Sequence, residues 1–195
     1  MKTLIACLLL LAGTAASAEE LTLEQVAERL PDAPILRADF RQQQHLALLP
    51  QPLTATGDLL LAGERGLLWR VRTPFESEIK LIDGTLYSNG QADTLPGGEA
   101  FARRLMAVLS GDIEALKPHF RIQAREEGDQ WRLDLTPRND TLARVLAGIR
   151  LGGQQGPEFF RLDYPNGDYS ITRLSNLEYP DTLSDAEERR FAAPR

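Results

Sequence analysis

The side chains that most often carry chemistry are scarce in this chain and do not form a catalytic or metal-binding pattern. Its two imidazoles, His45 and His119, each lack a second histidine or a cysteine at metal-ligand spacing. The sequence has no G-x-S-x-G elbow, no phosphate-binding P-loop and no dinucleotide fingerprint. The glycine-rich run from Gly152 to Gly156 is not followed by a helical pattern, so it predicts a turn.

Two pairs of carboxylates are the remaining candidates for acid–base chemistry. Glu76 lies near Glu78, and Glu126 precedes Glu127. An acid–base pair needs surroundings that separate the two pKa values. These residues lie at expected strand ends and turns rich in polar residues, which favours solvated carboxylates. A hydrolase is therefore the weakest reading, and we expect no enzyme activity, no metal and no cofactor.

The first eighteen residues have the pattern of an export signal. Lys2 is followed by an apolar run from Leu4 to Ala12, and Ala16-Ser17-Ala18 supplies the small residues before a cleavage site. The run is too short to span a bilayer as a stable helix. Cys7 lies inside this run and not at its end, which argues against a lipid anchor. We expect residues 1–18 to be removed and the product to be periplasmic.

The mature chain, residues 19–195, is expected to be a single domain and a monomer. Cleavage would remove the only cysteine, which suits an oxidising compartment. It would also remove Lys2, so the net charge of −6 would become −7. An acidic protein gains little from phosphate backbones, so nucleic acid is not an expected partner.

Helical patterns occur in two places. Leu23, Val26, Ala27 and Leu30 form one apolar face over 22–30, and Thr22 with Gln25 fits a capping box. A second helix is expected from Pro96-Gly97-Gly98 to about residue 109, with its apolar stripe on one side and Arg103 and Arg104 on the other. Gly111 ends it, and Asp112 caps a short helix over 113–117.

Strand patterns fill most of the remaining chain. Apolar and polar residues alternate with period two, and Asp83-Gly84 and Pro165 to Asp168 mark hairpin turns. Residues 141–147 fit either a helical turn or a loop. After Pro180 the chain is polar, and its end is expected to fray. The expected strands are 40–44, 54–62, 67–71, 79–82, 86–87, 120–125, 131–135, 149–151, 160–164 and 169–171.

These elements predict an α+β fold. Most of the expected strands have one apolar and one polar face, and an antiparallel sheet of that kind must cover its apolar side. The N-terminal helix and the central helical pair are the available cover. We therefore expect a curved antiparallel sheet, an open half-barrel, with helices as a lid over its concave apolar face.

In this order the residues resemble the periplasmic outer-membrane lipoprotein carrier LolA and its relatives. Phe40-Arg41-Gln42-Gln43 is similar to the family's Phe-x-Gln strand, and Gly57-Asp58-Leu59 with Leu68-Trp69-Arg70 to Thr73-Pro74 is similar to its Gly-x-Leu…Trp…Pro stretch. Ile82 to Tyr87 resembles its aspartate–glycine turn, and Leu135-Thr136-Pro137-Arg138 follows the lid. The resemblance covers nearly the whole mature chain and rests on the order of these motifs.

Two features depart from the family pattern. Gly63-Glu64 stands where the family has Arg-Pro, with Arg65 two positions later; in the family that arginine is associated with latching the lid. The C-terminal Phe-x-Pro-Pro segment is replaced by residues 185–195. The resemblance therefore implies the carrier fold more strongly than the housekeeping lipoprotein role, and other lipids are possible cargo.

The resemblance implies a carrier that binds acyl chains of lipoproteins or glycolipids and moves them from an inner-membrane transporter to an outer-membrane receptor. The alternative is an interaction or sensor module of the same fold with a filled core. In the carrier hypothesis, the cavity wall and lid comprise Leu59, Leu61, Leu67, Trp69, Val71, Ile79, Leu81, Phe101, Leu105, Met106, Leu109, Trp131, Leu133, Phe160 and Leu162.

Overall fold

The computed structural model describes residues 21–92 and 98–192. Within this part of the chain, eleven strands form one antiparallel sheet in the order β6-β5-β4-β3-β2-β1-β11-β10-β9-β8-β7. The strands are β1 Ile35–His45, β2 Leu53–Ala62, β3 Gly66–Thr73, β4 Ser77–Ile82, β5 Thr85–Ser88, β6 Gln91–Ala92, β7 Phe120–Glu127, β8 Gln130–Pro137, β9 Gly148–Gly153, β10 Phe159–Asp163 and β11 Tyr169–Glu178. The helices are α1 Leu23–Ala27, η1 Gly63–Arg65, α2 Gly98–Ser110, α3 Ile113–Leu116, α4 Asp140–Ala143 and α5 Asp185–Arg190.

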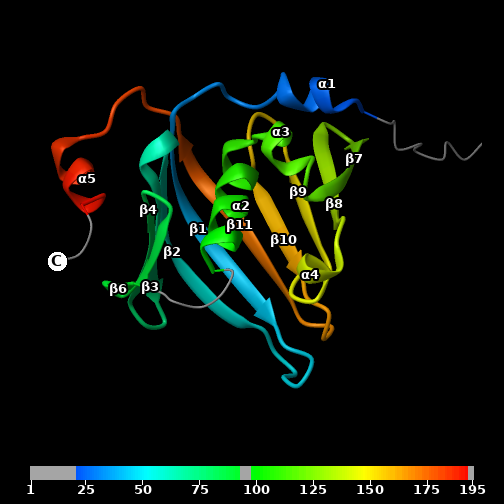
Figure 1. Cartoon of the computed structure of the whole chain (residues 1–195), viewed down its shortest axis with the longest axis horizontal. Helices are drawn as coiled ribbons and strands as arrows, with labels where there is room; N and C mark the ends of the chain where they lie inside the picture. The colour runs from blue at the N-terminus through cyan, green and yellow to red at the C-terminus, as the bar shows by residue number, and fades with distance from the viewer. Residues whose placement is uncertain (1–20, 93–97, 193–195) are drawn as a thin grey trace, which may run out of the picture.

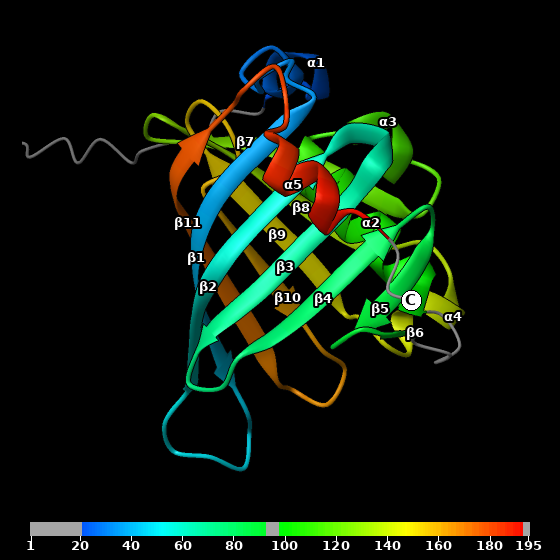
Figure 2. The same cartoon turned by 90° about the vertical axis from the view of Figure 1, so that its left-hand side faces the viewer.

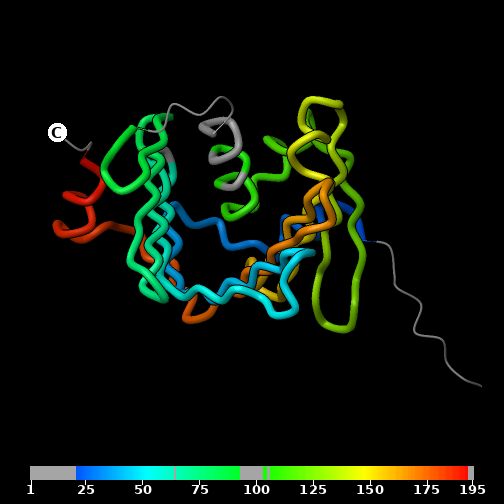
Figure 3. The backbone as a smooth tube through the Cα atoms, turned by 90° about the horizontal axis from the view of Figure 1, so that it is seen from below, coloured from blue at the N-terminus to red at the C-terminus, as the bar shows by residue number. Residues whose placement is uncertain are grey.

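The sheet curves into an open trough, which confirms the predicted fold class. Seen from below, α2 lies in the hollow of the trough, and α5 lies outside it (Figure 3). We call the face that packs against α2 the inner face and the opposite face the outer face. Figure 1 shows α2 in front of the central strands, and Figure 2 shows α5 across the outer side of β2 to β4.

The predicted turns form where backbone geometry demands them. Asp83 and Gly84, with φ of 49° and 79°, make the tight link between β4 and β5, as the aspartate–glycine pair predicts. Between β10 and β11, the amide of Tyr164 donates to the carbonyl of Asp168 at 2.9 Å, and Gly167 has a φ of 86°. Strands that follow one another in sequence pair within each half of the sheet, β1 pairs with β11 to join the halves, and several strands extend beyond their predicted ends.

α1 is shorter than predicted, whereas α2 and α3 end close to the residues at which they were predicted to end. α1 ends at Ala27, although its capping box forms: the amide of Gln25 donates to Thr22 Oγ1 at 3.2 Å, and the amide of Thr22 donates to Gln25 Oε1 at 2.8 Å. Gly111, at φ 70°, ends α2, and the Asp112 side chain caps α3 by accepting from the amide of Ala115 at 2.9 Å. Of the segment 141–147, residues 141–143 belong to the short helix α4 and residues 144–147 form a turn and loop that lead to β9.

The polar segment after Pro180 forms a helix that the sequence analysis did not predict, and the last residues, 193–195, lie outside the described part of the structure. Ser184 and Glu187 form a capping box that starts α5, and Phe191 behind it is 5% exposed. Phe191 covers a second apolar cluster on the outer face, with Leu183 and Tyr87 at its edge. The buried members of that cluster are Ile35, Leu60, Ala62, Leu68, Ile82 and Phe191.

Candidate functional site

The inner face is a continuous apolar surface built from both halves of the sheet. Strand pairing places Leu59 opposite Trp69, and Leu61 opposite Leu67, so side chains two residues apart point into the trough from neighbouring strands. Most of the predicted wall residues belong to this cluster. They are Leu59, Leu61, Leu67, Trp69, Leu81, Trp131, Leu133, Phe160 and Leu162, all buried, with Val71 partly buried at the edge.

An aromatic contact at the middle of the trough joins the two halves. Trp69 stacks on Phe40 with ring centroids 4.1 Å apart, and it meets Phe160 edge-on at 6.1 Å. Gly57 makes room for the Phe40 ring, because a Cβ there would lie 2.7 Å from the ring and 1.9 Å from the carbonyl oxygen of Arg70. Phe40 was not among the predicted wall residues. Leu36, Ala38 and Phe40 are spaced two residues apart, however, and this spacing indicates that all three lie on the same buried face.

The helix α2 covers this surface with its C-terminal half. Val108 and Leu109 are buried, and Met106 is half-buried against the same cluster. Phe101 and Leu105 belong to α2, but their side chains lie outside the described part of the structure.

One arginine of α2 departs from its predicted orientation. Arg104 was expected to face solvent, but it is half-buried, and its Nε is enclosed with no hydrogen-bond partner. The reason is helical geometry: Arg104 is four residues before Val108, so it shares the flank of the face that packs on the sheet.

The inner face becomes polar and more open toward the β1–β2 loop. Ile79, a predicted wall residue, lies beside Trp69 but is 43% exposed, and Leu53 is 52% exposed. On β11, Ser170 and Thr172 point into the trough, and Thr172 Oγ1 accepts from Gln42 Nε2 at 3.3 Å. Near the loop the exposed inner-face residue is therefore Leu53, whereas Ser170 and Thr172 make the face polar there and are buried; Ile79 is exposed at the β4 edge, level with Trp69.

The covered part of the inner face is closed in this structure. Apart from Val71 and Ile79, the predicted residues of the wall on the sheet are 7% exposed or less. Within residues 21–92 and 98–192, the described cavities open on the outer face or beside Leu21 near β7. At the aromatic centre the wall residues pack against one another and against Val108 and Leu109 of α2, so a ligand there would have to displace some of these contacts.

A family model described as outer membrane lipoprotein carrier protein LolA-like matches residues 15–162, which is more than half of the chain. The chain belongs to the LolA-like family. No curated protein sequence gives a significant match.

Solved structures share the LolA-like fold at low identity. NE2245, a LolA superfamily protein from Nitrosomonas europaea, has a TM-score of 0.48 at 11% identity, covering 88% of this chain and 98% of that chain. MucB has a TM-score of 0.50 at 13% identity, covering 85% of this chain and 61% of MucB. The Pseudomonas aeruginosa MucA/MucB complex has a TM-score of 0.45 at 14% identity, covering 85% of this chain and 59% of the matched chain. This chain thus spans less than two thirds of MucB.

The family pattern associates the arginine before the tryptophan strand with the lid. In this LolA-like protein that arginine, Arg65, lies beside the C-terminal helix instead. Arg65 ends η1, and its Nη2 lies 3.7 Å from Glu188 Oε1 of α5. The contact is on the outer face and does not involve α2. Arg65 therefore helps to hold the C-terminal helix, which is itself a departure from the family pattern.

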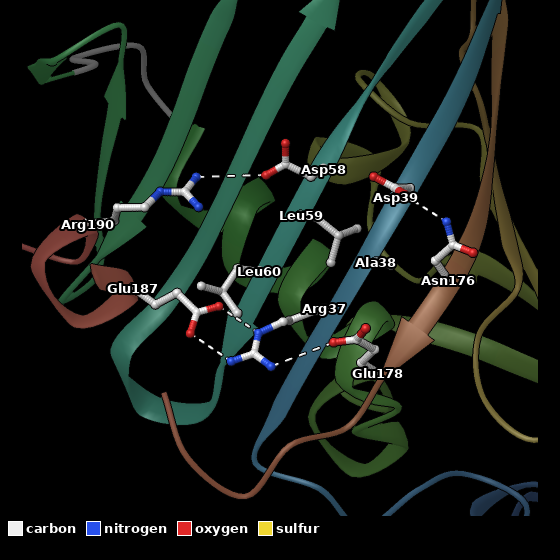
Figure 4. A pocket seen from close by; sticks show the side chains of 10 residues that line it. All are labelled: Arg37, Ala38, Asp39, Asp58, Leu59, Leu60, Asn176, Glu178, Glu187 and Arg190. Atoms are coloured by element: carbon white, nitrogen blue, oxygen red, sulfur yellow. Dashed lines mark hydrogen bonds and ion pairs between the residues drawn. The ribbon is translucent and has the colours of Figure 1, made fainter. Parts of the chain in front are cut away.

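The C-terminal helix is fixed to the sheet by a group of ion pairs that we call the clasp: Arg37–Glu187, Arg190–Glu78 and Arg65–Glu188. Arg37 donates to both oxygens of Glu187, from Nε at 2.6 Å and from Nη2 at 2.7 Å. Arg190 Nη2 donates to Glu78 Oε1 at 3.2 Å. Figure 4 shows Arg37 between Glu187 and Glu178 at a cavity of 230 Å³. The Arg37 guanidinium lowers the pKa of Glu187 from 4.5 to about 2.

The remaining candidates for chemistry have structural roles. His45 stacks on Tyr169 with ring centroids 4.3 Å apart. Across residues 21–92 and 98–192, no group of three histidine, cysteine or acidic side chains is placed to hold a metal ion. In the same residues, no helix has the length and apolar character needed to cross a bilayer.

Proposed function

We propose that this protein is a non-catalytic carrier that binds acyl chains of lipoproteins or related lipids on its inner face, beneath α2, in the periplasm. It would take this cargo from an inner-membrane transporter and give it to an outer-membrane receptor. Residues 1–18 would serve as the cleaved export signal, and residues 19–195 as one carrier domain. The family assignment supports a carrier or binding protein, and the observation that carries the proposal is the apolar inner face, with α2 packed across its aromatic centre and α1, α3 and α4 at its margins.

The physics of transfer explains why such a surface is useful. Burying an acyl chain contributes about 0.8 kcal/mol per methylene, so moving a long chain through water unaided costs on the order of 10 kcal/mol. Leu59, Trp69 and Leu133 offer a substitute apolar wall. Release requires that the bound state remain adjustable, and Met106 at the edge of the lid suits an adaptable contact because methionine has several rotamers.

A second candidate is an interaction or sensor module whose inner face is a permanent core. The closed packing of the wall in this structure favours it. A solved MucB structure shows that protein in complex with MucA, and a protein partner of that kind is the corresponding proposal for this chain.

The substitution Met106→Glu separates the two candidates. In the carrier, it places a charge where acyl chains lie, and an unpaired charge in an apolar site costs several kcal/mol. Binding of a fluorescent fatty acid should fall at least about tenfold. Unfolding should change little, because an opening lid lets water reach the carboxylate. In a filled core, the same change should lower stability by a few kcal/mol, or roughly 10 °C in Tm.

Two control variants make the result specific. Met106→Leu keeps an apolar side chain of similar volume and should retain fatty-acid binding. Ser110→Glu adds the same charge at the exposed last residue of α2, so it should preserve binding as well. If Met106→Glu unfolds the domain, or leaves fatty-acid binding unchanged, the lid assignment is wrong.

A further inference from the structure

The outer face carries a pocket, away from the clasp, in which arginines gather around an aromatic ring. We call it the arginine pocket; its volume is 410 Å³, and it spans β8, β10 and β11. Arg161 Cζ lies 3.7 Å from the centroid of Tyr169 beside it. The lining residues used in the argument are Arg132, Glu158, Phe159, Arg161, Ile171 and Arg173.

One row of directly paired residues explains how the pocket forms. Across five strands, pairing aligns Arg132, Gly152, Phe159, Arg173 and Arg41 on the outer face. Gly152 lets the Arg132 side chain lie flat, because a Cβ there would be 2.4 Å from Arg132 Nη1 and 2.5 Å from the Phe159 ring. Arg132 Cζ accordingly sits 4.5 Å from the Phe159 ring centroid.

The positive charge in this row is only partly neutralised. Arg132 Nε donates to Glu127 at 2.9 Å, yet its Nη1 is enclosed without a hydrogen-bond partner. Arg173 and Arg41 face each other directly and are exposed, and no ion pair is formed by either among the described residues. Like charges directly opposite on a sheet destabilise it, so this arrangement is not explained by stability.

Glu158 is the one carboxylate among the lining residues, and its charge offsets part of the positive charge of the arginines. Glu158 accepts from Gln130 Nε2 at 3.2 Å and from the amide of Gln154 at 3.1 Å. Its oxygens are thus already engaged. Arg161 is paired with Asp163 at 2.6 Å, so Arg132 Nη1 on β8 and Arg173 on β11 are the donors that remain for a ligand, above an apolar floor of Phe159 and Ile171.

We propose that the arginine pocket binds a phosphate-bearing group, either a free phosphate compound or the headgroup of an anionic phospholipid. Guanidinium forks match the oxygens of phosphate and form charge-assisted hydrogen bonds to them. The volume falls in the range of small-ligand sites, whereas a protein partner would occupy a much wider surface. Because the pocket is on the outer face, this site is independent of acyl-chain binding under α2.

Binding of two probes to the mature chain tests the proposal. One arm measures inorganic phosphate by calorimetry; the other measures flotation with phosphatidylcholine vesicles that contain or lack phosphatidylglycerol. Arg173→Gln should weaken binding about tenfold, because it removes one charge-assisted contact. Arg121→Gln is the control, since Arg121 is an exposed outer-face arginine on β7 that does not line the pocket. If Arg173→Gln fails to fold, Arg132→Gln, which also lines the pocket, replaces it.

The two arms identify the source of the phosphate. The site is supported if Arg173→Gln weakens binding and Arg121→Gln does not. If the loss is seen with inorganic phosphate, the ligand is a soluble phosphate; if it is seen only with vesicles, the ligand is a lipid headgroup. The proposal is overturned if neither probe binds or if both variants weaken binding equally. Binding of an acidic peptide in place of both probes would also overturn it, by assigning the surface to a protein partner.

Discussion

Protonation of the clasp should loosen the C-terminal helix, and Glu187→Gln is the variant that isolates the effect. Both oxygens of Glu187 accept from Arg37. The carboxylate also accepts from the amide and hydroxyl of Ser184, at 2.8 and 2.6 Å. Removing its charge weakens both the ion pair and the cap of α5, while Phe191 remains able to pack on the outer face.

The size of the effect follows from the depressed pKa of Glu187. Its value falls from 4.5 to about 2, and about 1.4 kcal/mol per unit sets an upper bound near 3.5 kcal/mol. The side chains of Glu187 and Arg37 are 17% and 30% exposed. The measured stabilisation from solvent-exposed ion pairs is well below the upper bound set by such a pKa shift. We therefore expect about 1–2 kcal/mol from this pair.

The sign of the pH dependence is set by the direction of the shift. A carboxylate whose folded pKa is lowered stabilises the fold fully above its unfolded pKa and loses that contribution as the pH falls through the folded value. The contribution of Glu187 should thus be complete above about pH 4.5 and mostly lost near pH 2.

Urea unfolding of the wild type and Glu187→Gln across this range is the assay. The wild type should be more stable by about 1–2 kcal/mol at neutral pH, and this gap should shrink to less than half near pH 3. Glu114→Gln, which removes an exposed carboxylate from α3, should show a gap under about 0.5 kcal/mol at every pH. A gap for Glu187→Gln that does not change with pH would refute the reasoning.

Three further predictions concern packing, processing and cargo. Gly57→Ala should destabilise the domain by about 1–3 kcal/mol in urea unfolding, because the new Cβ overlaps Phe40 and the Arg70 carbonyl; an unchanged midpoint would contradict that contact. Intact mass of exported protein should show a chain beginning at Glu19, whereas retained residues 1–18 or acyl groups on Cys7 would disprove the signal assignment. Expression during depletion of a housekeeping LolA should rescue growth poorly, and full rescue would show that the altered segments do not restrict cargo.

The strands were predictable because one-sided burial leaves a clear alternation in the sequence. Leu67, Trp69 and Val71 lie on the inner face as expected. The inward face of β11 was not predictable in the same way, since its inner side is the polar pair Ser170 and Thr172. Alternation reports that two faces differ, but strand register decides which one turns inward.

The C-terminal helix was missed because its composition is polar. Its signals were present: Ser184 and Glu187 have capping-box spacing, and Leu183 and Phe191 flank the charged run. A six-residue helix shows too little apolar periodicity to be recognised alone. Its position depends on contacts with Arg37 and Glu78, which are more than a hundred residues away in sequence, and such contacts cannot be read from local pattern.

The two helical covers of the sheet are held in different ways, and this difference bears on function. α5 is held by the directional ion pairs of the clasp together with the packing of Phe191 on the outer face. The described inner side chains of α2 meet the sheet through Met106, Val108 and Leu109, apolar contacts that have no required direction.

An acyl chain can replace such contacts at little net cost. Withdrawing Val108 and Leu109 from the inner face loses roughly 3–6 kcal/mol of burial. Burying four to eight methylenes, at about 0.8 kcal/mol each, restores that amount. A closed inner face and a lipid carrier are therefore compatible, because the closed and loaded states differ by a small free energy, and a small difference is what both loading and release require.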